Sequence, residues 1–216
     1  MLSKTKIDQP SGYDTGKARE HNRSIPVVTG ATVQFVTSNA WPWMVLVVRL
    51  PAEPSRHRVA VWRELRRLGA LSLGQGVWTL PARPAFSEGV ERALKLVERG
   101  DGDVVVLDAV GHDKTDAARL EAQFTAAREA EWGEFLAECA KYEVELDREF
   151  AQGKFTLAEL DEEEQSLERL RRWYRELKLR DAFTAPSASE AEQRLKRCSE
   201  RLEAFAERVY GAVHQP

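Results

Sequence analysis

The sequence has few of the features that mark secreted, membrane-spanning or zinc-binding proteins. Cysteine occurs only at Cys139 and Cys198, a spacing that fits neither a disulfide framework nor a zinc site and that favours a reducing compartment. The longest apolar run, residues 44–48, is far shorter than the roughly 20 residues that cross a bilayer. Residues 1–39 contain no apolar signal-peptide segment. We therefore expect a cytoplasmic protein that makes no membrane contact.

The sequence also lacks the motifs of common catalytic and cofactor-binding sites. Its four histidines are scattered without metal-ligand spacing, and no GxSxG, P-loop or GxGxxG motif is present. The pair His112-Asp113 is only a weak indication of a metal or acid–base site. We therefore predict a protein that is not an enzyme, with no catalytic residues, no cofactor and no metal ligands.

Composition divides the chain into three parts. Residues 1–40 are rich in Ser, Thr, Gly and Lys and are predicted to form a flexible N-terminal extension, in which the β-like stretch 27–36 pairs weakly or not at all. Residues 41–111 carry signals of strands and helices in alternation. Residues 112–216 are charged and have a helical period throughout.

The middle part has the order of a ferredoxin-like βαββαβ domain. Apolar runs predict strands at 43–50, 70–73, 76–80 and 103–107, and helical periods predict helices at 55–68 and 87–97. Val61, Trp62, Leu65 and Leu68 are expected to form the inward face of the first helix. The second face of such a sheet needs cover from the C-terminal helices or from a second copy, so we expect a homodimer.

The last part is predicted to be a bundle of about three long helices. The first runs from 114 to 150 and ends near Gly153, the second covers 156–179 with Thr156 and Glu159 as a capping box, and the third extends to about Val213. The fold class is therefore α+β.

Arginines on the first helix form the first candidate binding surface. Arg56, Arg63 and Arg67 lie within about 40° of one another on a helical wheel, and Arg66 flanks them. Such a stripe can contact nucleic-acid phosphates. The alternative is a solvated helix face that is paired with local carboxylates.

Arg58 stands apart because the wheel places it on the apolar side of the helix, between Val61 and Leu65. An arginine in that position has to pair with a carboxylate, extend to solvent or bind an anion. Asp103, Asp108 and the carboxylates of the acidic C-terminal helices are candidate partners, and an oxyanion such as chromate is the alternative ligand.

The second candidate nucleic-acid surface is the segment 169–180, in which Arg171, Arg172 and Arg175 alternate with Trp173 and Tyr174. Arginines interleaved with aromatic side chains are found on nucleic-acid-binding surfaces. The alternative is an ordinary amphipathic helix, whose aromatic residues belong to the core and whose arginines neutralise the acidic residues before them.

Several segments resemble the N-terminal region of the chromate-resistance protein ChrB family. The similar segments are Val48-Arg49-Leu50-Pro51, Arg58-x-x-x-Trp62-Arg63-x-Leu65-x-x-x-Gly69-Ala70, Gly76-Val77-Trp78-x-Leu80-Pro81, Phe124-x-x-Ala127-Arg128-x-Ala130-Glu131-Trp132 and Arg180-Asp181-Ala182-Phe183-x-Ala185-Pro186. The resemblance covers about residues 43–210. It departs from the family at Gln75, where an Asp is common, and at Trp78, where a Tyr is common.

The resemblance implies regulation: control of the transcription of a chromate transporter, with DNA as a partner and chromate as the effector. The alternative is a non-catalytic dimerisation or oxyanion-sensing module that acts with a separate partner domain. The resemblance extends to the ferredoxin-like domains of phenylacetate-catabolism repressors and of CRISPR spacer-acquisition nucleases. The nucleases carry a metal-binding Asp at the end of the first strand, where this chain has Val48-Arg49-Leu50, so nuclease activity is not expected.

Overall fold

The structure is a computed structural model that describes residues 25–29, 32–36 and 42–214. The chain divides into two units, residues 1–39 and 40–216. In the first unit, β1 (Ile25–Thr29) and β2 (Thr32–Val36) form an antiparallel pair, with Ile25 opposite Val36. The rest of the predicted flexible extension, residues 1–24, 30–31 and 37–40, lies outside the described residues.

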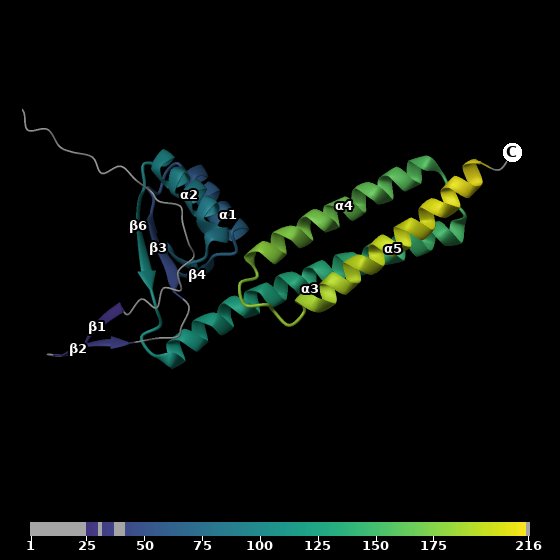
Figure 1. The fold of residues 1–216 in the computed structure, drawn as a ribbon. Coiled ribbons are helices and arrows are strands. Elements are labelled where there is room, and N and C mark those ends of the chain that lie inside the picture. The colour runs from purple at the N-terminus through teal and green to yellow at the C-terminus, as the bar shows by residue number, and fades with distance from the viewer. Residues whose placement is uncertain (1–24, 30–31, 37–41, 215–216) are drawn as a thin grey trace, which may run out of the picture. The chain divides into compact units, whose positions relative to one another are not determined.

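The second unit begins with a four-stranded antiparallel sheet and two helices. In chain order these are β3 (Trp43–Arg49), α1 (Ser55–Arg67), β4 (Leu71–Gly74), β5 (Val77–Pro81), α2 (Pro84–Arg99) and β6 (Asp103–Ala109). The strands are arranged in the order β4-β5-β3-β6. Both helices lie on one side of the sheet (Figure 1). The predicted α+β class is confirmed.

The helix-covered face of the sheet contains the first apolar core. Leu46 lies opposite Trp78 and Val106 in the register of the sheet, so that these side chains share one face. The buried residues that α1 and α2 add to this core include Val61, Leu65, Phe86, Val90, Ala93 and Val97. The continuous apolar run that predicted β3 therefore corresponds to a central strand.

The second face of the sheet is covered mainly at one end. Trp43 contacts Phe124 and Phe183, each with 5.7 Å between ring centroids. Phe124 belongs to the long helix that follows the sheet, so the C-terminal helices supply part of the cover that the sequence required. Farther along the same face, the side chains of Val105 and Leu107 remain 46% and 50% exposed.

Three long helices follow: α3 (Lys114–Gln152), α4 (Leu157–Arg180) and α5 (Ala188–Val213). They enclose the second apolar core, whose largest buried members include Trp132, Phe135, Leu146, Leu167, Leu177 and Phe205. The predicted signals for their ends are confirmed. Gly153 ends α3 in the left-handed conformation with φ 66°, and the Thr156 hydroxyl accepts a bond from Glu159 N at 3.3 Å.

Candidate nucleic-acid interface

The solvent-facing side of α1 is dominated by arginine. Arg56, Arg58, Arg63 and Arg66 are all exposed, and none of them forms an ion pair within residues 42–214. We call these four residues, together with Trp62, the α1 arginine face. An unpaired guanidinium carries its full positive charge into solvent, so this face attracts anions.

Trp62 lies at the centre of the α1 arginine face, and the sequence-based prediction that it packs inward is wrong. Its side chain is 52% exposed, whereas Val61 and Leu65 are buried. The guanidinium of Arg66 lies over the indole ring, 5.8 Å from its centroid. An exposed indole beside arginines offers a stacking surface as well as charge. The spacing in the sequence could have indicated this exposure. Arg58 and Arg66 stand four residues before and after Trp62, and residues four apart lie on the same side of a helix.

The expected position of Arg58 on the apolar side of the helix is also corrected. Arg58 is exposed, and it pairs with neither Asp103 nor Asp108 in the described part of the chain. At 100° per residue Arg58 lies about 20° beyond Leu65 and not between Val61 and Leu65, so it stands at the edge of the buried stripe, where its long side chain reaches solvent. Burial therefore gives no reason to assign an oxyanion ligand to Arg58.

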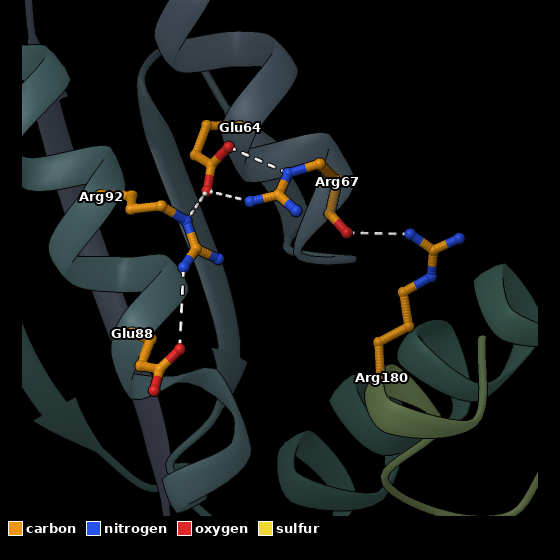
Figure 2. Close-up of polar contacts among 5 residues, drawn as sticks. All are labelled: Glu64, Arg67, Glu88, Arg92 and Arg180. Carbon is orange, nitrogen blue, oxygen red and sulfur yellow. Dashed lines mark hydrogen bonds and ion pairs between the residues drawn. The ribbon is translucent and has the colours of Figure 1, made fainter. Parts of the chain in front are cut away.

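Arg67 differs from the other arginines of α1 because a carboxylate neutralises it. Its Nε and Nη2 donate to Glu64 at 3.0 and 2.7 Å, and Arg92 Nε of α2 donates to the same carboxylate at 2.9 Å. Figure 2 shows Glu64 between the two guanidinium groups. Glu88 Oε2 lies 3.9 Å from Arg92 Nη1. The hydrogen bond from Arg67 is the main cause that holds the pKa of Glu64 below its usual value. Glu64 thus joins α1 to α2 through Arg92, and its carboxylate also holds Arg67, which is therefore not available in the way that Arg63 is.

Two further arginines hold the C-terminal end of α1. Arg180 Nη1 donates to the Arg67 carbonyl at 2.8 Å (Figure 2), and Arg128 Nη1 donates to the Gly69 carbonyl at 2.6 Å. Glu131 lies 3.1 Å from Arg128 and 3.0 Å from Arg180, which balances their charge. Cations at a helix C-terminus are favourable because its last carbonyls are unpaired. The orientation of α1 is therefore fixed against α3 and α4.

Arg128 is buried, at 5% exposure, unlike the other arginines in the segments that resemble the ChrB family. Desolvation is the main cause that lowers its pKa, and Glu131 opposes that effect. Arg128 is not among the site residues that the sequence predicts. Nothing in its local pattern shows that the carbonyl of Gly69, 59 residues earlier, is its partner.

The arginines of α4 form a separate group from those of α1, and most of them have partners close by. Arg175 Nη2 donates to Glu168 at 3.0 Å, and Arg171 Nη2 donates to Ser199 at 3.2 Å. Arg172 is exposed, without an ion pair in the part of the chain that the structure describes. This arrangement matches the alternative interpretation of the segment, in which the arginines neutralise neighbouring carboxylates.

The aromatic residues of the same segment belong to the core of the helical region. The rings of Trp173 and Tyr174 lie 5.5 and 5.9 Å from Phe135, and both side chains are half-buried. They are therefore not free to stack on bases. Of the two candidate surfaces, the α1 arginine face is the one whose charge and aromatic side chain are both accessible.

The weak indication of a metal or acid–base site at His112-Asp113 is explained by helix capping. Asp113 Oδ1 accepts bonds from Thr115 N at 2.8 Å and Asp116 N at 2.9 Å at the start of α3. Within the described residues, no group of three or more His, Cys, Asp or Glu side chains is placed to hold a metal ion. No helix in that part of the chain is long and apolar enough to cross a membrane.

Comparison with known proteins identifies a family and a curated relative. The profile of the family described as "Protein ChrB, N-terminal" matches residues 58–216. The relative is "Protein ChrB" of Cupriavidus metallidurans, which is 33% identical over 91 residues. The match covers 42% of this chain and 28% of that relative, so the chain spans less than a third of its length. The matched family region includes α1 from Arg58 onward and all three long helices.

Proposed function

Because the chain belongs to the ChrB N-terminal family, we propose that it is a regulator that controls transcription of a chromate transporter in response to chromate. Membership in this family links the chain to chromate resistance. Transcriptional control, the contact with DNA and the response to chromate constitute the proposal. It places the protein in the cytoplasm, where bacterial DNA and its regulators meet.

The observation that supports DNA contact is the α1 arginine face. Its four guanidinium groups have no carboxylate partners among residues 42–214, and a guanidinium group matches the geometry of a phosphate group. The hydrogen bonds of Arg128 and Arg180 to the end of α1 hold this face in place. Contacts of this kind position a protein on a duplex without reading its sequence.

We also propose that the protein acts without catalysis. The carboxyl and thiol groups whose pKa values depart most from normal are Glu163 and Cys139, and both are buried within the helical region. Neither is among the residues that line the cavities beside Trp43 and Gln123, beside Ala118 and Pro186, or beside Glu162 and Arg172. A general acid or base has to reach a substrate, so these groups are poorly placed for chemistry.

The element order and the strand order β4-β5-β3-β6 favour a ferredoxin-like arrangement of residues 41–111. We propose this arrangement as the scaffold that presents α1. An experimental structure in which β3 and β6 are not adjacent would contradict it.

The test of DNA contact compares two variants that remove the same charge from different helices. The first, Arg56→Gln/Arg63→Gln/Arg66→Gln, alters the α1 arginine face, and the second, Arg171→Gln/Arg172→Gln/Arg175→Gln, is the matched control on α4. Fluorescence anisotropy measures their binding to DNA from upstream of the protein's own operon and to a scrambled duplex, with and without chromate.

We expect the α1 variant to lose affinity for both duplexes, while the α4 variant binds as the unmodified protein does. Chromate should release the upstream DNA if the protein senses it directly. Equal binding by the α1 variant and the unmodified protein would remove the proposed interface. A loss confined to the α4 variant would transfer the role to that helix.

A further inference from the structure

The outer edge of β6 is a strand edge without a partner in the part of the chain that the structure describes. The sheet order β4-β5-β3-β6 places β6 last, and β6 pairs with β3 over all seven of its residues without a bulge. Its outward N–H and C=O groups form a regular row. Such an edge is a template for another strand.

The side chains in the middle of β6 leave this edge apolar, with a carboxylate only at Asp103 and Asp108. The strand reads Asp103-Val-Val-Val-Leu-Asp-Ala109 and contains neither Lys nor Pro, the residues that commonly prevent edge pairing. Val105, Val106 and Leu107 are 46%, 41% and 50% exposed, so apolar surface is accessible on both faces of the strand. A regular edge whose middle residues are apolar on both faces is suited to pairing.

We propose that β6 pairs antiparallel with β6 of a second copy, around a twofold axis at Val106. Val106 is the middle residue of the strand, so this register pairs all seven residues. It places Val105 opposite Leu107 of the second copy, and Leu107 opposite Val105 of the second copy. The apolar row that Val47 and Val105 form in the register of the sheet thus continues across the axis.

The positions of the two carboxylates in the strand are compatible with pairing to a second copy in this register. Asp103 falls opposite Ala109, and Asp108 falls opposite Val104, so that no carboxylate faces another across the axis. Like charges directly opposite each other destabilise a strand pair. The result is a continuous eight-stranded sheet in which each copy contributes the same surface, as a twofold interface requires.

The twofold axis has a consequence for α1. Since α1 and α2 cover the same side of each sheet, the axis leaves both α1 arginine faces on one side of the joined sheet. The dimer would thereby present two symmetric basic surfaces to DNA. This consequence rests on the proposed function, whereas the dimer itself does not.

The test uses a pair of double variants with the same number of charged residues. Val105→Lys/Leu107→Lys places Lys opposite Lys twice across the axis, whereas Val105→Lys/Leu107→Glu places Lys opposite Glu twice. Both variants make the open face of the sheet equally polar. Leu73→Lys on the other edge strand, β4, is the control, because Leu73 is similarly exposed at 47%.

Light scattering after size exclusion, over a concentration series, should give twice the mass of one chain for the unmodified protein, for Leu73→Lys and for the Lys/Glu variant. The Lys/Lys variant should be a monomer with an unchanged circular dichroism spectrum. A monomeric unmodified protein would overturn the proposal. So would a Lys/Lys variant that remains dimeric, or a Lys/Glu variant that is as monomeric as the Lys/Lys variant.

A cross-link tests the register without depending on charge. Directly opposite residues in an antiparallel pair lie roughly 4.5–5.5 Å apart between Cα atoms, within the range that a disulfide spans. Val106→Cys should therefore form a covalent dimer under mild oxidation, while Asp101→Cys, outside the strand, should not. The native Cys139 and Cys198 are buried and do not compete. Failure of Val106→Cys to form the covalent dimer, or equally efficient cross-linking of Asp101→Cys, would refute the register.

Discussion

Replacing Glu163 by Gln should stabilise the protein at neutral pH, because the carboxyl group of Glu163 is buried without a cation. The residue is 6% exposed, and it forms no ion pair in the described part of the chain. Its neighbour Glu149, by contrast, lies 3.5 Å from Lys154. Burial is the largest cause that raises the pKa of Glu163 to about 7, and the next causes are repulsion from Glu145, Glu149, Glu159 and Glu162.

The magnitude follows from the difference between the pKa values of the folded and unfolded states. An ordinary Glu carboxyl has a pKa of 4.5, and the folded value is about 7. Each pH unit between them corresponds to about 1.36 kcal/mol, so the charged carboxylate destabilises the folded state by at most about 3 kcal/mol. Below pH 4.5 both states hold the proton and the cost is absent. The free energy of unfolding therefore falls as the pH rises from 4.5 to about 7.

Urea denaturation of the unmodified protein and of Glu163→Gln over the pH range 4.5–8 measures this cost. Gln keeps the size of Glu without the charge, so the variant should gain little at pH 4.5 and up to about 3 kcal/mol at pH 8. Glu164→Gln is the control, because that neighbour is exposed and is not among the carboxylates that raise the pKa of Glu163, so it should leave the pH dependence unchanged. Parallel curves for the unmodified protein and Glu163→Gln would refute the reasoning.

Three further predictions follow from buried and exposed side chains. Arg128→Met should lower the free energy of unfolding in urea by about 2 kcal/mol, because it leaves the buried carbonyl of Gly69 without its donor and removes one of the two cations beside Glu131; a loss below about 0.5 kcal/mol would contradict this. Trp62→Ala should change stability by no more than about 0.5 kcal/mol yet weaken DNA binding, and an equal loss of stability to that of Leu65→Ala would contradict its exposure. Cys139 and Cys198 should react with a thiol reagent only as fast as the protein unfolds, because both are free thiols that are fully buried. A hydrogen bond with Cys198, together with burial, also raises the pKa of the Cys139 thiol. Rapid labelling of the folded protein would contradict this.

The elements of the second unit were predictable because their signals are local. The apolar run 43–50 predicts the central strand β3. Gly153 marks the C-terminal end of α3, and Thr156 marks the N-terminal end of α4. Each signal depends on residues that are adjacent in the chain. A turn that needs φ above zero and a cap that needs a hydroxyl both act over a few residues.

The site was less predictable because exposure depends on what packs against a helix. The wheel position of Trp62 is about 100° from that of Val61, and only the place of α2 and the sheet decides which of the two is covered. The same holds for Arg58, at the edge of the buried stripe. The contact of Cys198 Sγ with the Cys139 carbonyl at 3.9 Å joins residues 59 positions apart, and no local pattern encodes it.

The response of DNA affinity to salt tests the proposed interface most directly. For a duplex, each phosphate contact contributes about 0.9 to the slope of log affinity against log salt. Removing Arg56, Arg63 and Arg66 should therefore reduce that slope by up to about 2.7, if each guanidinium contacts one phosphate. A variant whose slope equals that of the unmodified protein would show that the α1 arginine face does not bind the DNA backbone.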